Sequence, residues 1–123
     1  MKLMTRVPAV LAICVLAAAS HRVEARTLEI LEQAHELRLV NVTFPTAPVG
    51  SVIFRDCGDC DTQSAAINTS TRFLTTAGPV GQQDFLARVA DLRQANAAAD
   101  TTLTIFCSVA DGSVTRIVLQ VSD

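Results

Sequence analysis

The chain has no tryptophan, no tyrosine and a single lysine, Lys2. Without tryptophan or tyrosine it offers few rings on which nucleic-acid bases or sugars can stack. Its 10 basic residues are outnumbered by 12 acidic ones, and basic side chains that neutralise phosphates supply most of the affinity of proteins for nucleic acids. The composition therefore argues against a nucleic-acid-binding protein.

A long apolar segment is also missing. The longest apolar stretch runs from Val7 to Ala19, interrupted only by Pro8, whereas a transmembrane helix needs roughly 20 residues. Lys2 and Arg6 precede this stretch, and small residues follow it, which is the pattern of a secretory signal peptide. We interpret residues 1–25 as a signal peptide and expect a periplasmic or secreted protein that keeps no membrane anchor after cleavage.

Two cleavage points are plausible, after Ser20 and after Ala25. The second fits better, because Val23 and Ala25 satisfy the preference for small residues at the third and first positions before the cut. Cys14 is removed with the signal, and the large residue before it argues against lipidation. The remaining chain carries seven basic and 11 acidic residues, a net charge of −4.

Residues 27–40 have helical spacing, and Pro45 and Pro48 end any continuation. The positions near one helical face are Leu28, Leu31, His35 and Leu39. We expect residues 26–49 to form an N-terminal helix and a proline-containing linker, with His35 on the helix surface.

Residues 50–123 are predicted to form one β-rich domain. Strands are expected over 50–57, 62–68 and 70–76, followed by a turn over 77–81. A second amphipathic helix is expected over 82–98, with Phe85, Leu86, Val89, Leu92 and Arg93 at helical spacing.

The clearest local pattern is a hairpin over residues 101–121. Apolar residues alternate on both sides of Asp111-Gly112, a dipeptide that favours a tight hairpin turn. The residues expected on one face are Leu103, Ile105, Cys107 and Val109 in the first arm and Ile117, Leu119 and Val121 in the second. Thr115 would lie on the same face of the second arm and is compatible with it.

The expected fold class is mainly β with two helices (α+β). From residue 50 the order of elements is βββαββ, the order of the oligonucleotide/oligosaccharide-binding (OB) fold. This part of the chain resembles small uncharacterised exported bacterial proteins with OB-like barrels. The resemblance rests on Thr71–Leu74, on a short helix with Phe85 and on a final hairpin that ends in Val114–Leu119. Over residues 50–121 the resemblance implies a small five-stranded barrel and no particular activity. An open antiparallel sheet with helices on one face is the alternative.

Cys57-Gly58-Asp59-Cys60 is the main chemical motif. We expect Cys57 and Cys60 to form a local disulfide that pins a turn between strands. Asp56 and Asp61 flank the motif, and negative charge disfavours the thiolate that exchange chemistry requires. The alternative is a periplasmic thiol-redox or metal-handling protein that uses this motif.

A metal held by the two thiolates would need two more ligands. His35 and Cys107 are available, besides carboxylates and His21 if it survives processing, but no second Cys-x-x-Cys exists, and we expect neither a metal site nor a cofactor. Cys107 is expected to be buried and free, although pairing with one of the motif cysteines stays open.

Nothing in the sequence resembles a catalytic site. We therefore expect an exported, non-enzymatic structural or binding module that recognises an unidentified protein or small molecule. The sequons at Asn41 and Asn68 matter only in a host that glycosylates.

The preferred cleavage site predicts that the exported protein begins at Arg26. N-terminal sequencing of exported material checks this prediction. An exported, folded protein that still begins at Met1 would contradict the signal-peptide interpretation.

Overall fold

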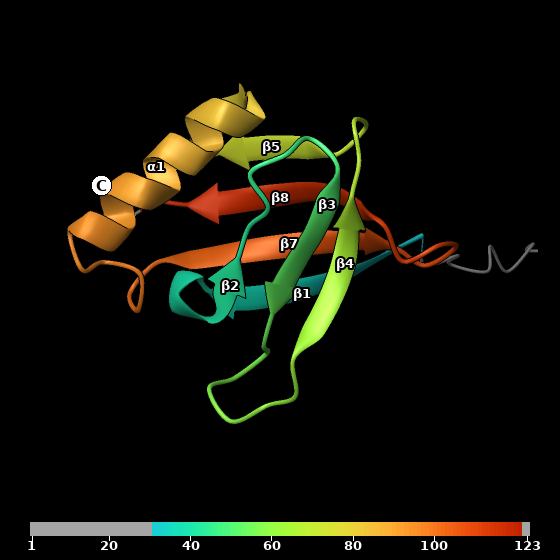
Figure 1. The fold of residues 1–123 in the computed structure, drawn as a ribbon, viewed down its shortest axis with the longest axis horizontal. Helices are drawn as coiled ribbons and strands as arrows, with labels where there is room; N and C mark the ends of the chain where they lie inside the picture. The colour runs from blue at the N-terminus through green and yellow to red at the C-terminus, as the bar shows by residue number, and fades with distance from the viewer. Residues whose placement is uncertain (1–30, 122–123) are drawn as a thin grey trace, which may run out of the picture.

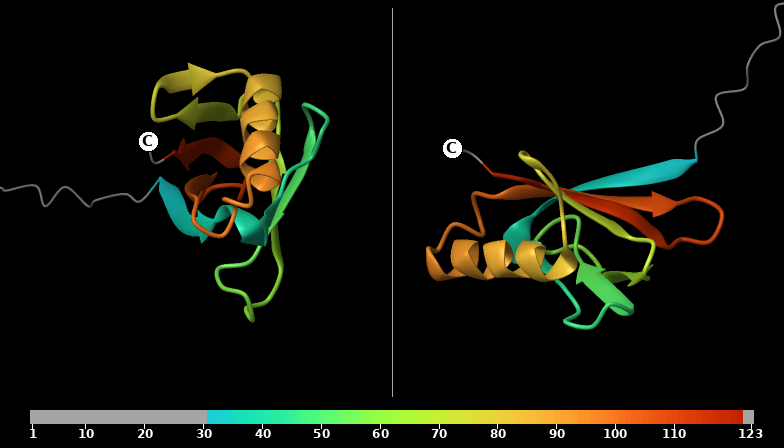
Figure 2. Two further views of the ribbon diagram at one scale, coloured as in Figure 1. Left: turned by 90° about the vertical axis from the view of Figure 1, so that its left-hand side faces the viewer. Right: turned by 90° about the horizontal axis from the view of Figure 1, so that it is seen from above.

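The computed structural model describes residues 31–121, so the predicted signal peptide over residues 1–25 lies outside the described residues. The elements are β1 Glu32–Arg38, a 3-10 turn Leu39–Asn41, β2 Val42–Thr43, β3 Gly50–Phe54, β4 Gln63–Ile67, β5 Arg72–Thr75, β6 Gly78–Val80, α1 Gln82–Gln94, β7 Thr102–Ser108 and β8 Val114–Gln120. They form two layers (Figures 1 and 2). A five-stranded sheet in the order β1-β7-β8-β5-β6 is one layer, and a three-stranded sheet in the order β2-β3-β4 together with α1 is the other.

The core lies between these layers. The inner face of the five-stranded sheet contributes the fully buried Leu103, Ile105, Ile117 and Leu119. Phe85 of α1 is also fully buried, and its ring centroid lies 5.4 Å from that of Phe44 and 5.1 Å from that of Phe73. Burial of each such side chain contributes about 1.5–3 kcal/mol, so apolar packing of this inner face holds the layers together.

The predicted hairpin is confirmed as β7 and β8. The hydroxyl and the N–H of Ser113 donate to the carboxylate of Asp111, and they lower the pKa of Asp111. These two hydrogen bonds therefore stabilise the turn at pH values above the usual pKa of an aspartate. The stabilisation is lost as the pH falls through the lowered pKa of Asp111. A β-bulge turns Val114 rather than Thr115 inward, and Val109 is exposed instead of facing the core.

The helix expected over residues 27–40 is wrong. Residues 32–38 form β1, which pairs antiparallel with β7 along its whole length. Glutamate, alanine and leucine favour a helix, but these local preferences are weak beside tertiary pairing and burial. As a strand, β1 directs Leu37 into the core and leaves Glu36 and Arg38 exposed.

The OB-like barrel is also wrong. The described residues form two sheets, neither closed into a barrel, and contain one α-helix of 13 residues. The alternative open antiparallel sheet fails as well, because β5 pairs parallel with β8 and the second sheet shares the covering of the inner face with α1. The predicted turn over 77–81 contains β6. Pro79 has no backbone N–H to donate, and it is tolerated there because β6 is an edge strand.

The helix α1 ends earlier than the predicted residue 98. Asn96 has a φ of 54°, and the N–H of Ala97 donates to the carbonyl of Leu92 at 2.9 Å. This left-handed cap satisfies the last carbonyl groups and stops the helix. Within residues 31–121, α1 and the 3-10 turn both lack the length and apolar content needed to cross a membrane.

The packing predicts a large difference between two isoleucine truncations. Ile105→Ala opens a cavity in the core and should lower the free energy of unfolding by about 2–5 kcal/mol. Ile53→Ala removes the same atoms from a side chain that is 45% exposed, and it should cost about 1 kcal/mol or less. Urea unfolding of both variants checks this, and equal losses would contradict the described core.

Candidate functional site

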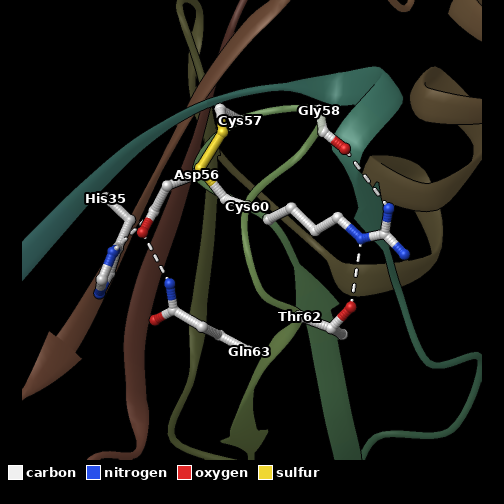
Figure 3. The surroundings of a disulfide bond; sticks show 8 residues. His35, Asp56, Cys57, Gly58, Cys60, Thr62 and Gln63 are labelled. Carbon is white, nitrogen blue, oxygen red and sulfur yellow. Dashed lines mark hydrogen bonds and ion pairs between the residues drawn. A yellow bond between two sulfur atoms is a disulfide. The ribbon is translucent and has the colours of Figure 1, made fainter.

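An eight-residue loop, Arg55–Thr62, joins β3 to β4 and carries the predicted disulfide (Figure 3). We call it the disulfide loop. Cys57 and Cys60 are bonded to each other, with their Cα atoms 5.0 Å apart. The N–H of Cys60 also donates to the carbonyl of Cys57 at 3.2 Å, so a hydrogen bond and a covalent bond close the same turn.

Asp56 anchors the start of this loop. Its Oδ2 accepts a hydrogen bond of 2.6 Å from Nε2 of Gln63, and its Oδ1 lies 3.3 Å from Nδ1 of His35 (Figure 3). The His35 ring also packs against Phe54 with centroids 5.1 Å apart. The carboxylate therefore connects β1 of the first sheet to the loop and to β4 of the second.

The sequence placed His35 on a helix surface, and that placement is wrong. His35 lies on the inner side of β1, and its side chain is only 15% exposed. Sequence reasoning missed the contact of His35 with Asp56 and the hydrogen bond from Gln63 to Asp56. The alternation of Gln33, His35 and Leu37 along residues 32–38 is the one signal that could have revealed this side of a strand.

Arg55 also holds the loop in place, through hydrogen bonds of its side chain and its backbone. Its Nε donates to Oγ1 of Thr62 at 3.1 Å, and its Nη1 reaches the carbonyl of Gly58 at 3.5 Å. Its backbone N–H donates to the carbonyl of Asn41 at 3.1 Å. The two ends and the middle of the disulfide loop are thus tied to one another and to the body of the protein.

The tip of the loop is nevertheless exposed, including Cys57 and Gly58. A recess of about 600 Å³ lies between the loop and β1. Its lining includes Glu36, Arg38, Asn41, Asp56, Cys57 and Gly58. A fixed loop beside a polar recess is an arrangement suited to recognition.

The surroundings of the sulfurs do not favour exchange chemistry. Exchange motifs gain thiolate stability from a helix N-terminus or from nearby positive charge. Here the strand β4 follows Cys60, and the exposed neighbours Asp59 and Asp61 are acidic. The guanidinium of Arg55 is the nearby positive charge, and it already donates to Thr62 and Gly58. Within residues 31–121 no group of three or more histidine, cysteine, aspartate or glutamate residues is placed to hold a metal ion.

Cys107 is buried in β7, and among the described residues it is the one cysteine outside the disulfide. Burial raises the pKa of its thiol. It faces the core as predicted, and it therefore belongs to the packing of the sheet rather than to the loop.

Comparison with known protein families, with curated proteins and with solved structures found no match for this chain. The geometry of the site is therefore the basis for assigning a function.

Replacing Cys57 and Cys60 together by serine should lower the free energy of unfolding by about 2 kcal/mol or less, the value expected for so short a covalent loop. The protein should still fold, because the core residues lie elsewhere. Urea unfolding followed by circular dichroism measures the loss. A double variant that fails to fold would contradict the local role of this disulfide.

Cys107 should react slowly. A raised pKa leaves less thiolate at pH 8, and burial restricts access, so alkylation in the native protein should be at least about tenfold slower than in urea. Mass spectrometry of alkylated peptides follows the reaction. A disulfide peptide that contains Cys107 would contradict the pairing seen here.

Proposed function

We propose that the protein is an exported, non-enzymatic binding module that contacts a partner protein through its disulfide loop. The compartment is supported by the disulfide, because such bonds persist in oxidising environments, and by the signal peptide expected over residues 1–25. One observation carries the proposal. Hydrogen bonds of Arg55 and Asp56 hold the disulfide loop in place, while its tip is exposed.

The length of the loop supports a role beyond connection. Two residues suffice to join antiparallel neighbours such as β3 and β4, whereas this loop has eight and a covalent cross-link. Binding through an ordered loop loses little conformational entropy, so prior ordering increases affinity. Anchoring by Asp56 and Arg55 makes the loop such a preorganised surface.

The charge of this surface indicates the chemistry of the partner. Asp59 and Asp61 are exposed, and neither takes part in an ion pair within the described residues. Arg55, the nearest basic residue along the chain, already donates to Thr62 and Gly58. The loop is therefore net negative, and we infer a partner that presents lysine or arginine side chains, because complementary charge directs association.

A thiol-redox protein is the second candidate, and the exposure of Cys57 is the observation in its favour. The acidic surroundings and the absence of a helix after Cys60 oppose it. The reduction potential separates the two functions. A value below about −300 mV indicates a structural disulfide, and a more oxidising value indicates exchange chemistry.

The proposal predicts that Asp59→Asn/Asp61→Asn removes partner binding. Immobilised protein is exposed to periplasmic extract or culture fluid of the source organism, and captured proteins are quantified. The loop variant should retain about tenfold less of the specific partner than wild type, since charge complementarity is lost.

The matched control is Asp91→Asn/Asp100→Asn, which removes the same charge from exposed positions outside the loop. It should capture the partner as wild type does. Equal capture by both variants, or thiol exchange turnover that depends on Cys57, would contradict the proposed function.

A further inference from the structure

β1 is an edge strand of the five-stranded sheet (Figure 1). It pairs with β7 on one side, and no strand among residues 31–121 pairs with its other side. An open edge presents unpaired backbone N–H and C=O groups that can accept another strand. The strand contains neither proline nor glycine, the residues that interrupt such pairing.

The direction of the backbone groups can be assigned along β1. The carbonyl of Leu31 accepts from the N–H of Val109 at 3.0 Å, and the N–H of Leu39 donates to the carbonyl of Thr101 at 2.9 Å. In an antiparallel ladder alternate residues bond to the same neighbour. Odd-numbered residues therefore bond to β7, and the even-numbered ones direct their backbone groups to the open edge. These are Glu32, Ala34, Glu36 and Arg38.

We propose that a second copy of this chain occupies the open edge, with the two β1 strands antiparallel about a two-fold axis at His35. In this register Glu32 of each copy lies opposite Arg38 of the other, and Ala34 lies opposite Glu36. All four residues direct their backbone groups to the edge, so each opposed pair can exchange two hydrogen bonds. The result is one continuous sheet across the dimer.

Charge selects this register over its neighbours. A two-fold axis at Ala34 would place Glu32 of one copy opposite Glu36 of the other, and an axis at Glu36 would place that glutamate opposite itself. Like charges directly opposite each other destabilise a sheet, and opposite charges stabilise it. The axis at His35 gives two Glu32–Arg38 pairs without a glutamate pair and aligns the two β1 strands over their whole length. An axis at Leu37 would also pair Glu36 with Arg38, but it would overlap the strands only over residues 36–38.

The side-chain contacts within one copy permit this pairing. Glu32 lies 3.4 Å from Arg116 and also accepts a hydrogen bond of 3.0 Å from the hydroxyl of Thr115, and Arg38 donates to the carbonyl of Ala99 at 3.2 Å. The ion pair with Arg116 is a surface contact that contributes little. The two carboxylate oxygens of Glu32 and the guanidinium of Arg38 can each take part in further hydrogen bonds. The pairing also places Leu31, which is 68% exposed, beside the recess under the disulfide loop of the other copy. Removal of that apolar surface from water favours association.

A charge exchange tests the proposal. Sedimentation equilibrium of the oxidised exported protein gives the dimer dissociation constant for wild type, Glu32→Arg, Arg38→Glu and the double variant. Each single change turns two attractive pairs into repulsive ones and should weaken the dimer by about tenfold. The double variant restores opposite charges and should return to within about threefold of wild type.

Ala34→Pro provides a second test, because it removes an N–H that faces the open edge and leaves the bonds to β7 intact. It should weaken the dimer while circular dichroism stays that of wild type. Asp59→Asn/Asp61→Asn should leave the dimer unchanged, which separates this proposal from the proposed function. The proposal is overturned if the wild-type protein is monomeric at about 1 mM. This includes the case in which the open edge binds only a peptide of another protein. A double variant that does not regain affinity overturns it too.

Discussion

The carboxylate of Asp56 connects the two layers at the point where the disulfide loop leaves the fold. It accepts from Gln63 on β4 and contacts His35 on β1. The disulfide alone closes only a four-residue turn and fixes nothing outside it. Without Asp56 the loop would keep the hydrogen bonds of Arg55 to Thr62 and Gly58 but would lose its link to β1. We therefore expect its tip to be less well ordered and the acidic surface to be less preorganised.

The edge position of β1 gives this contact its wider importance. A strand at the edge is held by one neighbour only, yet β1 carries His35, part of the lining of the recess and the backbone groups available to a second copy. Packing of His35 on Phe54 and of Leu37 in the core fixes which side of β1 faces inward. A slip of one residue would reverse every side chain, so these contacts also set the charges along the open edge.

The parts of the fold that the sequence predicted are those specified by local pattern. The β7–β8 hairpin follows from alternation around Asp111-Gly112, and α1 follows from the spacing of Phe85 and Val89. β1 was misread because its helix-favouring residues adopt a strand only when β7 is beside them, and the paired residues of β7 lie 64 to 76 positions later in the chain. A barrel could not be distinguished from two open sheets, since the parallel pairing of β5 with β8 leaves no mark in either strand.

The candidate site was predictable to a similar degree. A spacing of three residues assures that Cys57 and Cys60 are close enough to bond. The anchor to His35 spans 21 residues and joins a side chain on β1 to the start of the loop. No periodicity or motif encodes a contact between separate strands, so the recess and its lining are visible only in the folded chain.

The most direct test of this account is the mobility of the loop tip in solution. Backbone ¹⁵N relaxation of the oxidised protein gives order parameters for the N–H groups of Gly58 and Asp59. A loop anchored by Asp56 predicts values of about 0.8 in wild type, falling below about 0.6 in Asp56→Ala with the disulfide intact. Values below about 0.6 already in wild type would contradict the account, because the loop would then be flexible despite its anchors.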